Sequence, residues 1–185
     1  MAVSPFGLQD LMSERLPLLA NAFGIPHAWG ILPTRDGERV SEPVGLLHFV
    51  SWAETRALEG IDVPWSADFR SQYLECTGRF GPFRVVLEAG VFLEVPDNEL
   101  RSILEDAKIS GAKVVRFLIS RNLCGQRSED ALGWNARLCR TIDRLRGWLP
   151  LFEEQGVAIA VENHQDAGLD DLFRMIGALG DSPAF

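Results

Sequence analysis

The stretch Gly156–Asp166, which reads G-V-A-I-A-V-E-N-H-Q-D, decides the fold. Its five apolar residues, 157–161, lie between a glycine and a cluster of polar side chains. A short apolar run rich in β-branched residues is typical of a strand that is buried on both faces. Side chains alternate between the two faces of a strand, so Glu162 shares a face with Ala158 and Ala160. Glu162 then ends the strand, where parallel α/β proteins place their chemistry.

The composition indicates one soluble domain that acts on a small molecule. With 185 residues, 46% of them hydrophobic, the chain is long enough to bury a single core. A net charge of −8 and a pI near 4.9 disfavour a nucleic-acid partner, which a basic stripe would bind. Three cysteines without C-x-x-C spacing predict reduced thiols in a cytoplasmic protein. The chain lacks the pattern of a secretory signal and any apolar run of about 20 residues, so we expect no membrane partner.

The remainder of the chain alternates between strand and helix patterns. Leucines near helical spacing predict a lead-in helical segment over residues 1–22, followed by one domain over residues 23–185. We expect strands at 23–26, 61–63, 84–89, 113–119 and 157–162, with helices between them and after the last. Gly60 is expected to stop the first of these helices, and Gly147 and Pro150 to kink or restart the long one near residues 134–152. Strands that alternate with helices predict a parallel sheet of α/β class.

The motif V-A-I-A-V-E-N-H-Q-D, after a helix that ends in E-E-Q-G, resembles the xylose isomerase-like TIM-barrel superfamily. Members include sugar isomerases, sugar and sugar-phosphate epimerases, inosose dehydratases and endonuclease IV enzymes. The unit S-G-A-K-V-V-R-F at 110–117 is similar to the family's fourth strand, and the likeness extends from about residue 23 onward in element order. It implies a (β/α) TIM-barrel-like fold with about five of eight strands present, a C-terminally incomplete member, because a whole barrel takes about 250 residues.

The resemblance also implies a site. The family's glutamate at the end of strand five binds a divalent metal, and in the epimerases it is one of two acid/base carboxylates; both roles fall on Glu162. The implied reaction is a metal-assisted proton transfer next to a carbonyl of a small sugar or polyol. Mn²⁺, Mg²⁺, Co²⁺ and Zn²⁺ all suit such ligands. The family's other ligands come from strands six to eight, so we expect this chain to coordinate the ion incompletely.

Four further residues are candidates for substrate binding. His27 and Trp29 follow the first expected strand, where an aromatic ring either stacks on a sugar or simply packs. Asn163 and His164 follow Glu162; the histidine either contacts the substrate, orients a neighbouring ligand, or is solvated in its loop.

Other polar residues have structural interpretations. Arg116 is internal to the fourth expected strand, and a buried arginine needs a carboxylate partner. Glu88 or Glu162 could supply it, and we expect an Arg116–Glu88 pair. Asp166 is expected to cap the following helix, and His48 to be solvated.

Two other functions stay open. Five strands leave the first and fifth as unpaired edges, which predicts a non-catalytic partial barrel that acts as an assembly or interaction module. Such a chain is expected to form a homo-oligomer or to associate through its strand edges. An endonuclease IV-like nuclease is the third possibility, and the acidic balance disfavours it.

Overall fold

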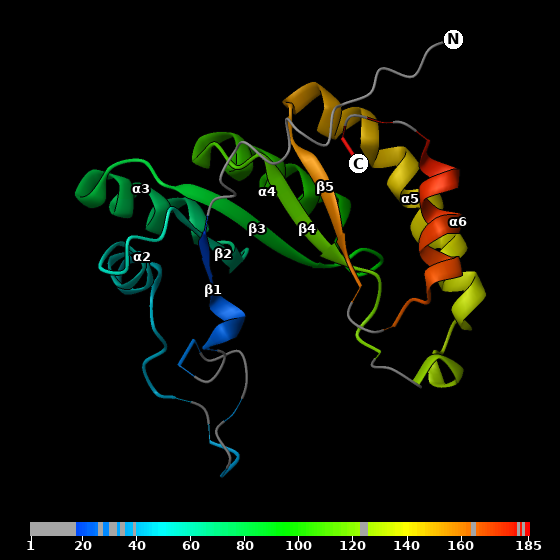
Figure 1. Cartoon of the computed structure of the whole chain (residues 1–185), viewed down its shortest axis with the longest axis horizontal. Helices are drawn as coiled ribbons and strands as arrows, with labels where there is room; N and C mark the ends of the chain where they lie inside the picture. The colour runs from blue at the N-terminus through cyan, green and yellow to red at the C-terminus, as the bar shows by residue number, and fades with distance from the viewer. Residues whose placement is uncertain are drawn as a thin grey trace, which may run out of the picture.

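The computed structural model describes residues 18–25, 28–29, 33, 36–38, 40–122, 126–163, 166–180, 182 and 184–185. Within these ranges five strands alternate with five α-helices (Figure 1). The strands are β1 (Leu19–Asn21), β2 (Gly60–Pro64), β3 (Arg84–Val91), β4 (Val114–Leu118) and β5 (Ala158–Glu162). The α-helices are α2 (Leu46–Glu54), α3 (Phe69–Phe80), α4 (Asp97–Ser110), α5 (Trp134–Gln155) and α6 (Leu169–Leu179), and two 3₁₀ turns are η1 (Ala22–Gly24) and η2 (Gln126–Glu129).

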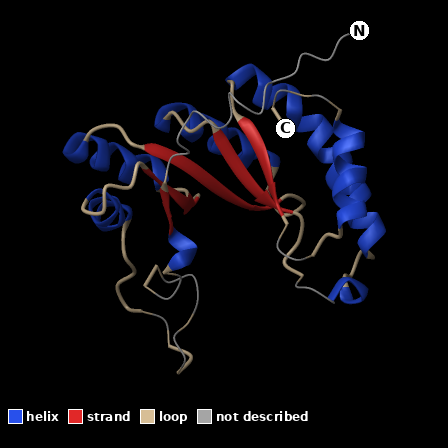
Figure 2. Cartoon of the chain, viewed as in Figure 1, coloured by secondary structure: helices blue, strands red, loops and turns tan. Residues whose placement is uncertain are grey.

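All neighbouring strands of the sheet are parallel, and their order is β1-β2-β3-β4-β5. A doubly wound sheet reverses its strand order at a switch point, and this sheet does not. Right-handed crossovers that always step the same way leave their helices on one face (Figure 2). The predicted parallel α/β architecture is therefore confirmed, whereas closure into a barrel stays a prediction.

The helix-covered face holds the core. Val63, Leu87, Val115 and Ile159 are successive register partners across β2 to β5, and all four are buried. Because side chains alternate along each strand, their sequence neighbours point to the opposite, more open face. A polar residue next in sequence to a member of this buried row must therefore lie on the open face.

Strand β1 begins earlier than the sequence predicts. It spans residues 19–21, inside the segment expected to be a lead-in helix, and residues 22–24 form η1 where the first strand was expected. The Asn21 side chain accepts the backbone N–H of Phe23 over 2.7 Å, which caps η1 and ends the strand. Residues 1–17 and Pro26 lie outside the described residues.

We expected Gly60 to stop a helix, and this prediction is wrong: Gly60 begins β2. Helix α2 ends at Glu54, and a Cβ atom at position 60 would lie 2.3 Å from the carbonyl oxygen of Arg84. The backbones of β2 and β3 approach too closely at this point for any side chain. The glycine is thus required by strand packing and not by the helix end.

Helix α5 is continuous through Gly147 and Pro150, so the expected restart is wrong. Phe117 of β4 stacks on Phe92 with ring centroids 4.5 Å apart, and it also contacts Trp148 and Phe152 of α5. These contacts lie on both sides of Pro150, and tertiary packing of this kind outweighs a local helix breaker. No helix in the described ranges is both long and apolar enough to cross a membrane.

Candidate functional site

Every strand places at least one polar side chain on the open face of the sheet. We call five of these residues, one from each strand, the polar row: Asn21 of β1, Asp62 of β2, Glu88 of β3, Arg116 of β4 and Glu162 of β5. Each lies on the face opposite the buried row, as strand alternation requires.

Arg116 is the centre of the polar row. Its Nη2 lies 3.1 Å from Oδ1 of Asp62, and its Nη1 contacts the carboxylate of Glu162. Asn21 donates from Nδ2 to Oδ2 of the same aspartate over 2.8 Å. The guanidinium lies 5.9 Å from the ring centroid of Phe23, within the range of a cation–π contact. One cation therefore joins carboxylates from β2 and β5.

The expected Arg116–Glu88 pair is wrong. Glu88 is the register partner of Arg116, but its Oε1 accepts the backbone N–H of Gly90 over 2.7 Å. The register of β3 shifts between Glu88 and Val91, and Gly90 has a φ of 85°. This bulge turns a backbone donor toward the carboxylate, which leaves Arg116 to the acids on β2 and β5.

The Glu88 carboxyl is buried, with 7% of the residue exposed. Burial raises its pKa above the usual value, and the charge of Asp62 adds to that effect. The Gly90 N–H and the guanidinium of Arg116 act in the opposite direction without cancelling it. Glu88 therefore favours the protonated form more than an exposed glutamate does.

Glu162 ends β5 on the alanine face, in the predicted position. Its side chain is 33% exposed, and Arg116 holds it. An arginine partner is what a purely structural strand-end glutamate would also have. The catalytic role of Glu162 therefore stays a prediction.

Of the other predicted site residues, the two that the structure describes, Asn163 and Trp29, do not converge on the polar row. Asn163 bonds within its own loop, to the N–H and C=O of Ala167. Trp29 packs edge-on against Phe49 with centroids 4.8 Å apart, and it also lines a cavity of about 320 Å³. That cavity lies at the carboxyl end of β2, beside Pro64 and Trp65. His27 and His164 lie outside the described residues.

Asp166 does not cap α6. It is fully buried and accepts the Ser120 hydroxyl over 2.7 Å, which joins the loops that follow β4 and β5. Gly168 occupies the cap position, and Asp171 accepts its N–H over 2.9 Å. His48 is exposed on α2, as predicted.

Another buried carboxylate, Asp130, fixes the start of α5. It contacts Arg137, accepts Nδ2 of Asn122 over 2.9 Å, and accepts the Leu132 N–H over 2.9 Å. Burial alone would raise the pKa of this carboxyl, but these donors together lower it below the usual value. Asp130 is therefore a structural anion at the start of α5.

The donor set at Glu162 does not fit a divalent metal. No group of three or more His, Cys, Asp or Glu among the described residues is arranged to hold an ion. The oxygens of Glu162 and Asp62 already face the guanidinium of Arg116, which supplies the positive charge. The described residues around Glu162 therefore do not match the predicted metal site.

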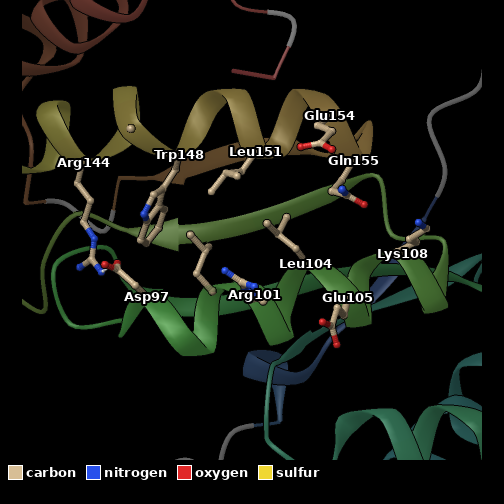
Figure 3. Close-up of a pocket in the computed structure, with 12 residues that line it drawn as sticks. Asp97, Arg101, Leu104, Glu105, Lys108, Arg144, Trp148, Leu151, Glu154 and Gln155 are labelled. Carbon is tan, nitrogen blue, oxygen red and sulfur yellow. Dashed lines mark hydrogen bonds and ion pairs between the residues drawn. The ribbon is translucent and has the colours of Figure 1, made fainter.

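A larger cavity, of about 860 Å³, lies between α4 and α5 on the helix side of the sheet (Figure 3). Asp97 at its rim pairs with Arg144 over 2.8 Å, and the wall residues Leu104 and Trp148 are themselves buried. Its charged side chains lie along the rims of two helices and do not form a cluster like that of the polar row. We therefore locate the candidate site on the open face.

Neither a protein-family model nor a curated protein matches the chain. The likeness to the xylose isomerase-like superfamily therefore stays a prediction based on the motif around Glu162.

Sequence reasoning missed two members of the polar row, Asn21 and Asp62. A signal existed for Asp62, because Ile61 and Val63 alternate around it and place the aspartate on the face opposite the core. For Asn21 the three-residue strand offers no comparable pattern.

Proposed function

We propose that the polar row catalyses proton transfer next to a carbonyl of a small sugar or polyol, as in a sugar isomerase or epimerase. One observation supports this most directly. Glu88 and Glu162 lie on the same face of a parallel sheet, and their environments differ: one is buried with a raised pKa, and the other is paired with Arg116. Titratable groups whose environments differ in this way are typical of an acid and a base in one site.

The roles follow from these environments. Glu162, held as a carboxylate by Arg116, takes a proton from the carbon next to the carbonyl. The electron pair of that C–H bond forms a C=C bond, and the π pair of the carbonyl moves to oxygen, where the guanidinium stabilises the enediolate. Glu88 in its protonated form donates to that oxygen. A proton then returns to carbon while the Glu88 carboxylate takes a proton back from oxygen: from the neighbouring hydroxyl in an isomerisation, or from the original oxygen in an epimerisation.

Substrate contacts are proposed from residues outside the polar row. Trp29 and Trp65 line the cavity at the end of β2, where an aromatic face suits a sugar ring. His27, Asn163 and His164 keep their predicted place as substrate contacts. Free thiols at Cys76 and Cys139 support the proposed cytoplasmic location.

Solvent-hydrogen exchange tests this function. The chain is incubated in D₂O with a panel of ketoses and aldoses, and deuterium incorporation is followed by NMR. Glu162→Gln should lower the exchange rate by about 10²-fold or more, the usual contribution of a positioned base. The control is Glu94→Gln, the same change at an exposed ion pair with Arg121. Absence of exchange with every sugar, or unchanged exchange in Glu162→Gln, would contradict the proposal.

A second candidate function is that of an assembly module. The N–H of Ile159 on the outer edge of β5 donates to the carbonyl of Ala184 over 2.7 Å, so this edge can pair with another chain segment. On helix α6, which follows β5 in the chain, three apolar side chains are more than half exposed: Leu169 (67%), Phe173 (61%) and Ile176 (52%).

Light scattering tests this alternative. If α6 and the β5 edge associate with a second copy, the wild-type chain is a dimer or larger, and Phe173→Asp dissociates it. Leu74→Asp is the matched control, because Leu74 is 56% exposed on α3, away from that edge. A monomeric wild-type chain would rule the module out.

A further inference from the structure

Two carboxylates of the polar row bond one guanidinium, and a third, Glu88, lies on the strand beside it. Asp62 on β2 and Glu88 on β3 lie on one side of β4, and Glu162 on β5 lies on the other. Arg116 reaches from β4 into the space between them, bonding Asp62 and Glu162. Its side chain is 15% exposed, so little water screens these charges.

We propose that Arg116 is a built-in cation that occupies the place of a divalent metal ion among these carboxylates. The polar row then works with a guanidinium, and it binds no divalent metal while Arg116 is present. This inference does not rest on the proton-transfer proposal, because it concerns which cation the carboxylates hold, whatever they do with it.

The geometry of the ligand atoms supports the inference. Divalent ions such as Mg²⁺ and Ca²⁺ bind carboxylate oxygens at about 2.0–2.6 Å. An ion bound by both Asp62 and Glu162 would have to enter the position of the guanidinium nitrogens, which already contact both acids. A doubly charged ion beside the guanidinium would also be repelled. The two cations therefore exclude one another.

The anchoring of Arg116 indicates that the guanidinium is fixed in this place. Its Nε is buried without a hydrogen-bond partner in the described chain, so the two terminal nitrogens make all of its polar bonds. Phe23 lies beside the guanidinium, and the Asn21 amide holds Asp62 in position. A preorganised cation that bonds two carboxylates in this way competes well with a hydrated ion.

The inference predicts a gain of metal binding when the guanidinium is removed. Arg116→Gln keeps much of the side-chain length but leaves Asp62 and Glu162 without their cation. Two carboxylates that face one vacated space, with Glu88 on the neighbouring strand, offer oxygen ligands of the kind that suits Mn²⁺. Arg121→Gln removes the same charge from an exposed ion pair with Glu94 and controls for net charge.

The experiment is a Mn²⁺ titration of the wild-type chain, Arg116→Gln, Arg121→Gln and Arg116→Gln/Glu162→Gln, with free Mn²⁺ measured by EPR. The wild type and Arg121→Gln should show no saturable binding up to about 1 mM, the weak end of biological affinities for such ions. Arg116→Gln should bind one Mn²⁺ ion at least about tenfold more tightly than this limit of about 1 mM. Its melting temperature should rise with added Mn²⁺. The double variant should lose this gain.

Two results would overturn the inference. One is saturable Mn²⁺ binding by the wild type that Glu162→Gln abolishes. The other is a folded Arg116→Gln chain, verified by circular dichroism, that gains no affinity. If Arg116→Gln does not fold, the wild type and Glu162→Gln decide alone: Glu162-dependent binding contradicts the inference, and its absence supports it.

Discussion

The backbone N–H of Gly90 donates to Oε1 of Glu88 over 2.7 Å, so a bulge in β3 supplies the hydrogen bond that a buried carboxyl needs. The bond separates Glu88 from its register partner Arg116 and gives the open face two acids in unlike environments.

Glu88→Gln should stabilise the protein at neutral pH. Burial raises the pKa of Glu88 above its ordinary 4.5, so its contribution to stability is present below the unfolded pKa and is lost as pH rises through the folded pKa. Glutamine is neutral at every pH and keeps an oxygen for the Gly90 N–H. Urea unfolding should therefore give a higher midpoint than wild type at pH 7.5, with the difference shrinking toward pH 4. A difference independent of pH would contradict this.

The Arg116–Asp62 pair should couple strongly. Both side chains are mostly buried, and removing one partner from a buried pair typically costs about 3–5 kcal/mol of unfolding free energy. We expect Arg116→Gln to reach that range, because it leaves two carboxylates without their cation. Arg116→Gln/Asp62→Asn should lose less than the sum of the single variants, with a coupling of about 0.5–3 kcal/mol. Chemical denaturation measures all three, and additive losses would count against a shared network.

Asp130→Asn should destabilise the start of α5 and reduce acid sensitivity. The Asp130 side chain pairs with Arg137 and is 1% exposed. Removing its charge should cost about 3 kcal/mol of unfolding free energy. The folded pKa lies below the usual 3.8, so the stability it supplies is present above that value and is lost as pH falls through the folded pKa. The thermal unfolding temperature should therefore fall less steeply between pH 7 and pH 3 in the variant than in the wild type. Asp143→Asn, at an exposed pair with Arg146, should leave the curve unchanged.

Gly60→Ala should destabilise the chain by about 1–3 kcal/mol, the range for overpacking, because the new methyl group meets the backbone of Arg84. Gly78→Ala is the matched control: it lies in helix α3 with no atom near the new carbon, and it should stabilise the chain by about 0.5–1 kcal/mol. Equal effects at the two positions, measured by thermal unfolding, would contradict the close approach of β2 and β3.

Local rules predicted much of this architecture. The run from Val157 to Glu162 indicated both the strand and the face on which Glu162 lies, because alternation depends only on neighbouring residues. Strand β1 was missed because three residues show no period, and the signal that ends it is one side-chain bond from Asn21. Gly60 was misread because a glycine after a helix looks like a stop, whereas the reason for it is Arg84 on another strand.

The partners inside the site could not be predicted in the same way. Arg116 and Asp62 are 54 residues apart, and which carboxylate the guanidinium reaches depends on sheet register and on the bulge at Gly90. Local sequence indicates that a buried arginine needs an acid; it does not rank Asp62, Glu88 and Glu162. The choice among them is made by the assembled sheet.

The short edge strand β1 has a consequence for fluctuations of the site. Three register pairs hold it to β2, whereas β3 is paired on both sides. Solvent deuterium should therefore enter the amides of β1 first, and each transient detachment frees Asp62 from Asn21 while Arg116 stays bound. The polar row thus loosens at its β1 end. The rate at which β1 detaches would then set how quickly a small molecule reaches the charged side chains.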